Sequence, residues 1–427
     1  MGAARGLLGI GVLIFIAWLM SSDRRRFPIK TVLAAMALQW LLALLVLKTE
    51  PGRAFFDAVA HVVTALLKGA DAGANFVFGP LAGDDPGVTW KAIAGIKIMT
   101  TIIIVATISS IGYHYGILQR VVAAMAWLMT RTLGVSGAEA LAGAANVFFG
   151  QTEAPLLVRP YISGMTRSEI MAMMTGGFAT VAAGVMAVYV DMLGQGDTDR
   201  MVSVARHLMT ASLMSAPAAF MLAKIMVPET GVPQTAGSVK VNLDRETRSF
   251  NDAATSGASE GMKLAINVLA MLIAFVALIK VLDIALTAFG QLSFMQPVVA
   301  GMGLEVLNLD GLLGLAFAPV AYLAGVDTGD CRTFGGLLGK AMATNELIAY
   351  SSLGQIIQDG SMSERSTLIA TYSLCGFANL SSIGIQIGGI GGIAPDRRAD
   401  LVQLGPRAML GGAMACWTTG CIAGVLG

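Results

Sequence analysis

Charged residues are scarce in this chain of 427 residues, because Asp, Glu, Lys and Arg together account for only 13% of it. The 28 basic residues nearly balance the 27 acidic ones, so that charge gives no support to nucleic acid as a partner. Hydrophobic residues make up 55% of the sequence, and the mean hydropathy is +0.72. This composition excludes a soluble protein and predicts an all-α polytopic membrane protein.

Cysteine and histidine are also rare. The four cysteines lie in apolar or glycine-rich surroundings without a CxxC pair or Cys/His spacing, and the three histidines have no mutual spacing that suggests a metal site. We therefore expect packing cysteines, no cofactor and no enzyme built on a redox or metal centre. The residues concerned are Cys331, Cys375, Cys416, Cys421, His61, His114 and His207.

About eight apolar runs are long enough, at roughly 17 to 25 residues, to cross a bilayer. They are Gly6–Met20, Thr31–Leu47, Ile96–Tyr113, Ile170–Leu193, Leu208–Met226, Leu264–Leu282, Thr367–Ile387 and Ala408–Leu426. Positive charges follow the first run, at Arg24, Arg25, Arg26 and Lys30, and no small-residue cleavage site is evident. We therefore expect a retained first span, a cytoplasmic first loop and an N-terminus outside.

Two further segments have a composition of their own. Between Arg53 and Lys68 apolar and polar side chains fall on separate helical stripes, which predicts a helix lying in the membrane interface. The stretch from Pro228 to Gly261 is rich in Ser, Thr, Gly and charge, and it predicts a polar linker between two halves of the chain.

The stretch from Asn146 to Tyr161, NVFFGQTEAPLLVRPY, places polar groups and a proline within a sequence that is otherwise apolar enough to cross a membrane. A carboxylate such as Glu153 costs about 2.5–3.5 kcal/mol at the bilayer centre on insertion scales, so that it marks a functional site. Pro155 interrupts a helix, and irregular backbone is tolerated in a membrane only where protein covers it or where it lines a cavity.

Motifs of the first half recur in the second half in the same order. GQTEAPLL (150–157), MTRSEI (165–170) and GGFATVAAGV (176–185) correspond to ATNELIAY (343–350), MSERST (362–367) and CGFANLSSIG (375–384). Paired polar breaks at corresponding positions predict a secondary transporter whose sites lie at discontinuous helices near the midplane.

A re-entrant hairpin is expected before each glutamate, over Gly134–Phe149 and Asp310–Val326, with glycines at Gly150, Gly177 and Gly376 permitting close approach. The expected division of the chain follows from these segments. It comprises N-terminal spans and scaffold (1–130), a first repeat with hairpin, broken helix and following span (131–227), the linker (228–261), a long scaffold helix (262–300), and a second repeat with the last span (301–427).

Five motifs together resemble the concentrative nucleoside transporter family in its bacterial eight-span, sodium-coupled form. They are GQTEAPLLVRPY, SGASEGMKLAINVLAMLIAF (256–275), FAPVAYLAGV (317–326), TNELIAY and CGFANLSSIGIQIGG. The resemblance covers nearly the whole chain. It implies a cation-coupled nucleoside importer of the bacterial inner membrane, with an inverted repeat, a homotrimeric assembly and elevator-type movement of a transport domain against a scaffold.

The resemblance also implies roles for residues at the matching positions. Gln151, Thr152 and Glu153 would face the nucleobase, and Glu346, Asn379 and Ser382 would hold the ribose hydroxyls. Apolar contact would come from Val185 and Phe377. A sodium ion would be held by the side chains of Asn146 and Thr180 and by the backbone at Phe149 and Val181, an all-oxygen set of the kind that hard cations prefer. Thr180 departs from the serine usual in the family.

Several alternatives stay open at the level of sequence. Proton coupling through Glu153 or Glu346 would replace sodium, and Glu153 and Glu346 could instead form structural ion pairs with Arg159 or Lys340. Asn379 and Ser382 could simply bond helix backbones across the bundle. An intramembrane hydrolase built on Asp327-Thr328-Gly329 lacks a second carboxylate motif, and a channel would not need two distinct polar tips.

Overall fold

The computed structural model describes residues 2–82, 93–236 and 247–427, and within these ranges the chain is helical without a strand. The first half contains α1 (Gly2–Leu19), α2 (Ile29–Lys48), α3 (Glu50–Phe78), η1 (Gly79–Leu81), α4 (Ala94–His114), α5 (Ile117–Leu133), α6 (Gly137–Asn146), η2 (Ala154–Val158), α7 (Arg159–Ile162), α8 (Arg167–Ala179), α9 (Ala183–Gly194) and α10 (Thr198–Met226). The second half contains α11 (Phe250–Gly290), α12 (Gln296–Gly301), α13 (Leu309–Leu323), α14 (Cys331–Ala343), α15 (Glu346–Gln358), α16 (Glu364–Ser373), α17 (Leu380–Ile393), η3 (Pro395–Arg397) and α18 (Arg398–Leu426).

Seven helical segments of the described chain are long and apolar enough to cross a membrane. They overlap seven of the eight expected spans. The eighth, Thr367–Ile387, is divided into α16 and α17, which are separated by an irregular stretch over residues 374–379. The segment Arg167–Gly194 is likewise divided, because α8 ends before Thr180 and α9 begins at Ala183. Both expected broken helices are therefore present.

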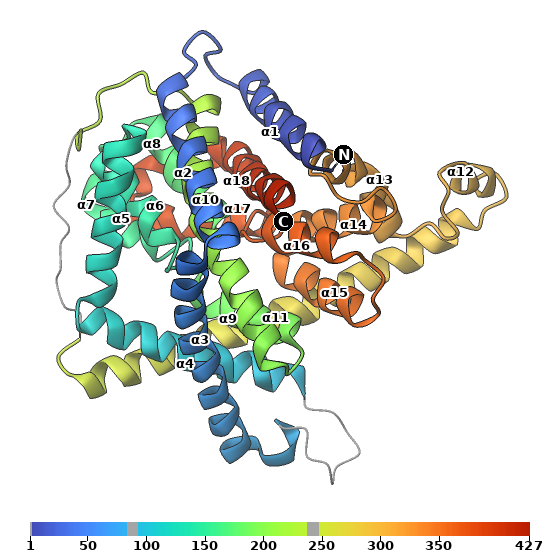
Figure 1. The fold of residues 1–427 in the computed structure, drawn as a ribbon, viewed down its shortest axis with the longest axis horizontal. Coiled ribbons are helices and arrows are strands. Elements are labelled where there is room, and N and C mark those ends of the chain that lie inside the picture. Colours follow the sequence, from blue (N-terminus) through green and yellow to red (C-terminus); the bar gives the residue numbers. More distant parts are fainter. Residues whose placement is uncertain (1, 83–92, 237–246) are drawn as a thin grey trace.

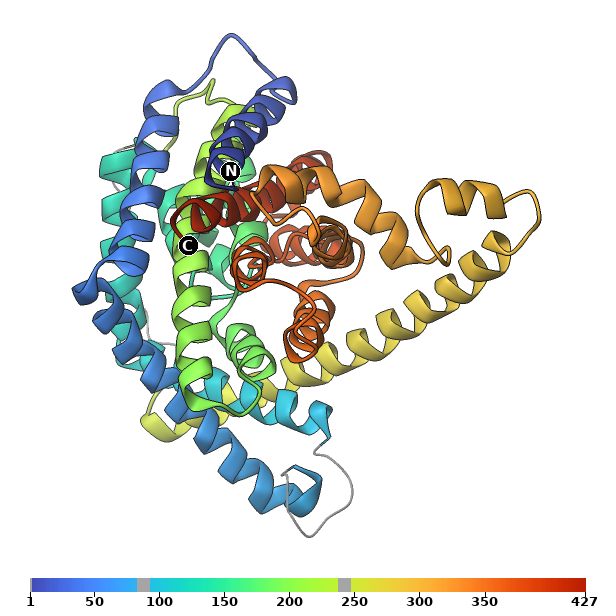
Figure 2. The same ribbon diagram turned by 45° about the vertical axis from the view of Figure 1, so that its right-hand side comes forward.

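The core of the fold is formed by α8, α10 and α18, which pack against one another near the middle of the molecule (Figure 1). More than four-fifths of the apolar window of each corresponding segment is buried. In contrast, α11 crosses α4 and then extends away from the bundle toward α12 (Figure 2). Only 6% of its apolar window is buried, so a long apolar surface is left for lipid or another chain.

Three sequence expectations need correction. The run Asp310–Val326 forms the separate helix α13 and a turn, and the two helices that flank the tip at Glu346 are α14 and α15. The expected linker is shorter, since α11 already begins at Phe250, and its residues 237–246 lie outside the described chain. The amphipathic helix α3 is longer than Arg53–Lys68, and its polar stripe is partly turned inward: Thr64 is buried, and Asp57 pairs with Arg206 of α10 at 2.8 Å.

Candidate functional site

Two helix starts meet at the candidate substrate site. Glu346 is the first residue of α15, and Asn379 caps α17 by accepting a hydrogen bond from the Ser382 amide at 2.8 Å. The Asn379 Nδ2 atom donates to Glu346 Oε2 at 3.0 Å. The carboxylate of Glu346 therefore lies at the N-terminus of its own helix and contacts the cap residue of a second helix.

Glu346 is buried, and its charge is met by neutral groups. Its Oε1 atom accepts a hydrogen bond from the Tyr189 hydroxyl of α9 at 2.9 Å, and the Tyr189 ring stacks on Tyr350 with centroids 4.3 Å apart. Among the residues that the structure describes, no cation lies within ion-pair distance of this carboxylate. Lys340, the partner considered in one alternative, pairs with Asp310 at 2.8 Å, so the alternative of a Glu346–Lys340 pair is wrong.

The tip of the first hairpin completes the same polar layer. Gln151 donates to the Ser382 hydroxyl at 3.0 Å and accepts a hydrogen bond from Gln386 at 3.0 Å. Glycine at position 177 of α8 allows Gln386 to come close to this helix, because a Cβ atom on Gly177 would lie 2.9 Å from Gln386 Nε2. One chain of hydrogen bonds thus runs from Gln386 through Gln151 and Ser382 to Asn379 and Glu346.

The other predicted substrate residues lie beside this layer. Thr152 packs against Gly389 of α17, Val185 is buried on α9, and Phe377 is half-buried in the break before α17. Glu153 is exposed, and its carboxylate accepts a hydrogen bond from the Gly150 amide at 2.5 Å. The structure therefore brings Gln151, Asn379, Ser382 and Glu346 into direct contact, whereas Glu153 stays outside their network.

The four residues predicted to hold a cation surround the break after α8. The side chain of Asn146 lies beside Gly176, whose carbonyl accepts a hydrogen bond from the Thr180 hydroxyl at 2.9 Å. Both polar atoms of Asn146 are buried and lack a hydrogen-bond partner in the described part of the chain. Phe149 lies at the adjoining tip, and Val181 is buried in the break itself.

A buried amide that leaves both its oxygen and its nitrogen unpaired is costly unless a ligand uses them. The chemistry of these residues fits a hard cation, since the Asn146 Oδ1 atom, the Thr180 hydroxyl and the carbonyls of the break between α8 and α9 are oxygen donors of the kind such ions prefer.

Two residues of the site were not predicted from the sequence. Tyr189 stands alone in an apolar run, where a tyrosine is normally read as packing, and only its partner Glu346 reveals its role. Gln386 is a single amide in the apolar segment Leu380–Ile393, and it is fully buried between Gln151 and the Met174 carbonyl. That isolated amide in a glycine-rich apolar helix was a usable signal.

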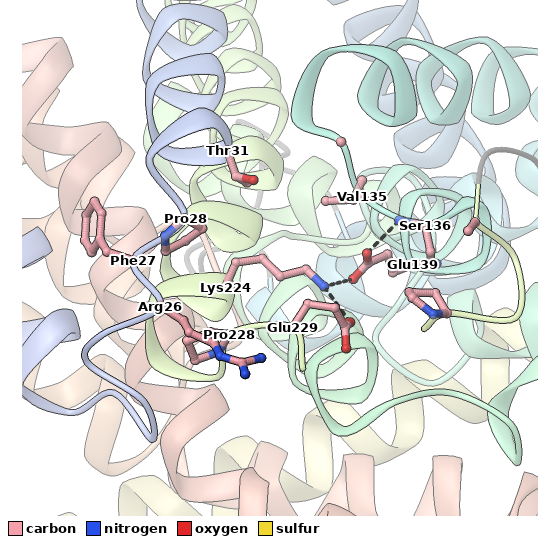
Figure 3. Close-up of a pocket in the computed structure, with 13 residues that line it drawn as sticks. Arg26, Phe27, Pro28, Thr31, Val135, Ser136, Glu139, Lys224, Pro228 and Glu229 are labelled. Atoms are coloured by element: carbon pink, nitrogen blue, oxygen red, sulfur yellow. Dashed lines mark hydrogen bonds and ion pairs between the residues drawn. The ribbon is translucent and has the colours of Figure 1, made fainter. Parts of the chain in front are cut away.

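A second buried polar cluster lies at the base of the first hairpin, beside a cavity of about 450 Å³ (Figure 3). Lys224 of α10 points between two carboxylates there, 2.8 Å from Glu139 Oε2 and 3.5 Å from Glu229 Oε2. Glu139 also completes the capping box at the N-terminus of α6, where its side chain accepts a hydrogen bond from the Ser136 amide at 2.7 Å. This cluster joins α6, α10 and the segment after α10, and it contains none of the predicted site residues.

The Asp-Thr-Gly tripeptide forms a turn. The Asp330 amide donates to the Asp327 carbonyl at 2.9 Å, and the side chains of both aspartates accept hydrogen bonds from Ser363 at the start of α16. These contacts cap a helix, which removes the basis of the hydrolase alternative.

Two broken helices, two hairpin-like tips and a polar layer between them define a multi-pass membrane protein of the transporter class. Family models match most of the chain: the C-terminal part of Na+ dependent nucleoside transporters over residues 207–424, the N-terminal part over residues 8–81, and a nucleoside recognition domain over residues 95–196. The chain belongs to the family of Na+ dependent, concentrative nucleoside transporters, and it is not an enzyme.

Individual relatives agree with this assignment. An uncharacterized transporter of Haemophilus influenzae is 39% identical, over 100% of this chain and 98% of its own. Sodium/nucleoside cotransporter 1 of Mus musculus is 33% identical over 98% of this chain and 63% of its own. A solved structure of CNTnw in an inward-facing substrate-bound state is 34% identical, with a TM-score of 0.89, over 100% of this chain and 99% of that one.

Proposed function

We propose that the chain imports nucleosides by symport with a cation, and that sodium is the coupling ion. The observation that carries the proposal is the buried Glu346 carboxylate. Its side-chain donors among residues 2–82, 93–236 and 247–427 are neutral, and it lies in one layer with Asn379, Ser382 and Gln151. Carboxylate and amide oxygens in this arrangement suit ribose hydroxyls, and the amide of Gln151 suits the edge of a nucleobase. Thr152, Val185 and Phe377 would complete the walls, and Glu153 would reach the base after a movement of the tip.

Coupling to sodium rests on Asn146, because both polar atoms of its buried side chain lack a hydrogen-bond partner among the described residues. With Thr180 and the carbonyls at Phe149 and Val181 it would form a neutral oxygen cage. Because the cage adjoins the tip that carries Gln151, an ion bound there would fix that tip and favour binding of the nucleoside.

The wider arrangement in the proposal is an elevator-type carrier of the bacterial inner membrane. The two hairpins and the two broken helices would move as a transport domain relative to a scaffold, with the expected division of the chain at residues 131–227 and 301–427. The exposed apolar length of α11 supports a homotrimer in which this helix meets its symmetry mates.

Uptake of radiolabelled uridine into proteoliposomes tests the proposal. Matched vesicles receive an inward sodium gradient or an inward proton gradient, and we expect accumulation that needs sodium and saturates with uridine. Accumulation driven by protons alone would keep the substrate site and assign coupling to a carboxylate such as Glu346. Failure to accumulate uridine, adenosine or any other nucleoside under either gradient would contradict the proposal.

The variant Asn146→Ala separates the ion from the substrate. It removes the Oδ1 ligand, so we expect the sodium concentration needed for half-maximal uridine binding to rise at least about tenfold, the effect of losing roughly 1.4 kcal/mol. Uridine affinity at saturating sodium should approach that of the wild type. An unchanged sodium dependence would remove Asn146 from the cation site.

A further inference from the structure

An apolar cavity of about 240 Å³ lies between α1, α13 and α18, remote from the nucleoside layer. Its lining residues are all apolar side chains, cysteine or glycine. They are Gly9, Val12, Leu13, Ile16 and Met20 of α1 and its end, Val320 and Leu323 of α13, and Leu410, Met414, Trp417 and Cys421 of α18. A cavity of this composition cannot hold hydrogen-bonded water and accepts only an apolar occupant.

The cavity follows α1 for most of its length. The N-terminal end of α1 packs closely, since a Cβ atom on Gly9 would lie 2.4 Å from the Leu323 carbonyl and one on Gly6 would lie 2.9 Å from Val425. Leu13 and Ala17 further along the helix are buried as well. In Figure 1 the N-terminal end of α1 lies beside the C-terminal end of α18 and near α13. From Gly9 to Met20 the helix rises roughly 16 Å, which gives the cavity the proportions of a lipid chain more than those of a compact solute.

Arg5 is a cation close to this cavity, although it does not line it. Arg5 is one helical turn before Gly9, and its guanidinium carbon lies 4.6 Å from the centroid of the Tyr322 ring. Its Nε and Nη1 atoms are buried without a hydrogen-bond partner, and Arg5 forms no ion pair with any residue that the structure describes. Asp327 and Asp330, which follow α13, are engaged by Ser363 instead.

Arg5 lies in the first turns of α1, where a long cationic side chain at the end of a span reaches the lipid headgroups, and the ring of Tyr322 offsets only part of its charge. Arg365 provides a contrast on the same side, because it donates hydrogen bonds to the carbonyls of Gly325 and Gly424. The charge of Arg5 therefore calls for an anion that can reach it beside an apolar cavity. A phosphate group is a strong acceptor for arginine.

We propose that this cavity is a binding site for an anionic phospholipid, with one acyl chain between α1, α13 and α18 and the phosphate at Arg5. Bilayer chains are as apolar as the cavity, so affinity comes from filling the void and from the charge of the headgroup. The lipid would complete the packing of α1 against α18. This site is independent of the proposed transport activity.

Trp417 provides a direct reporter, since it lines the cavity and is only 9% exposed. The test uses a chain in which Trp18, Trp40, Trp90 and Trp127 are replaced by Phe, in nanodiscs of phosphatidylcholine with a small fraction of lipid brominated on its acyl chains. We expect brominated phosphatidylglycerol to quench Trp417 fluorescence at least threefold more than brominated phosphatidylcholine at equal fraction. A matched chain that keeps Trp127, which is 62% exposed, should be quenched equally by both lipids.

Four substitutions assign the effect to the two parts of the site. Arg5→Gln should abolish the preference for phosphatidylglycerol, Arg5→Lys should retain part of it, and Arg25→Gln in the exposed first loop should leave it unchanged. Val12→Phe fills the cavity and should reduce quenching by both lipids, which keeps the test valid if Arg5→Gln does not fold. Equal quenching of Trp417 by both lipids would overturn the assignment of the headgroup, and absence of quenching by either would overturn the site.

Discussion

Two buried carboxylates of this protein lie in opposite electrostatic surroundings. Glu139, at the base of the first hairpin, has the ammonium group of Lys224 at 2.8 Å. Glu346, at the second tip, accepts hydrogen bonds from the Tyr189 hydroxyl at 2.9 Å and the Asn379 amide at 3.0 Å, and no cation of the described residues pairs with it. Burial of a charge is costly unless it is paired, so the first arrangement holds the fold together by itself, whereas the second gains from a ligand that adds donors.

The polar groups around Glu139 are paired with one another, whereas some of those near Glu346 lack a hydrogen-bond partner. Around Lys224, the Ser168 and Thr166 hydroxyls bond to the ammonium and to Glu229. Near the tips, Asn146 has two unpartnered atoms, and the Gln386 Oε1 atom also lacks a partner within the described chain. Unused hydrogen-bonding capacity is thus present where nucleoside and cation are proposed to bind, although Arg5, Gln39, Gln119, Ser212 and Ser373 also carry buried atoms without a partner in the described chain. The comparison can be tested by changing one charge or one donor at a time.

The largest effect is expected from Glu346→Gln. This change keeps the shape but removes the charge that would accept the ribose hydroxyls, so we expect uridine affinity to fall by on the order of 100-fold or more, about 3 kcal/mol or above. Calorimetric titration of purified protein with uridine measures it. Glu364→Gln, an exposed site in the first turn of α16, is the matched control and should bind normally. Normal uptake by Glu346→Gln would remove this residue from the site.

Lys224→Met should act on stability and spare binding. Removing the cation leaves Glu139 buried without its counter-charge, a loss of about 3–5 kcal/mol in the free energy of unfolding. We expect a lower melting temperature in detergent, and recovery of most of the loss when Glu139→Gln is combined with Lys224→Met. If the variant instead melted normally and lost uridine affinity, the cluster at the base would belong to the ligand site.

The sequence predicted the broken helices and most of the polar layer for a physical reason. Polar residues are expensive in apolar runs, so the paired polar breaks and Glu346 stood out from the sequence, whereas the roles of Asn379 and Ser382 came from the family resemblance. The second hairpin was misplaced because α13 is also short and glycine-rich. Its Gly314 packs against α14, where a Cβ atom on Gly335 would lie 2.5 Å from the Gly314 carbonyl. Glycine there serves helix packing, which a sequence alone does not distinguish from a hairpin.

Tyr189 and Lys224 were not predicted, because their roles depend on partners that are distant in the sequence. Tyr189 is 157 positions from Glu346, and no local pattern links them. The pairing of Lys224 with Glu139 is of the same kind. Glu153 shows the reverse case, because its cost in an apolar stretch made it prominent, yet the structure leaves it exposed with a local bond to the Gly150 amide.

Tyr189→Phe should have an intermediate effect, since it removes one neutral donor from a charged acceptor. A hydrogen bond to a charged group contributes about 1.5–3 kcal/mol, so we expect uridine binding to weaken by roughly tenfold to 100-fold with little change in melting temperature. Tyr161→Phe, a half-buried tyrosine on α7, is the control. Unchanged binding would mean that Asn379 alone positions the carboxylate.

The smallest effect is expected from Lys340→Met. Nearly unchanged uridine binding in this variant would support the contrast between Glu139, which is paired with a cation, and Glu346, which is not. Lys340 pairs with Asp310, whose side chain is 50% exposed, and such pairs contribute about 0–1 kcal/mol. Because Lys340 does not reach Glu346, uridine affinity measured by calorimetry should stay within about twofold of the wild type. A loss comparable with that of Glu346→Gln would instead place a cation beside Glu346 in the bound state. The two carboxylates would then be paired in the same way, and the neutral surroundings of Glu346 would no longer explain why the ligand binds there.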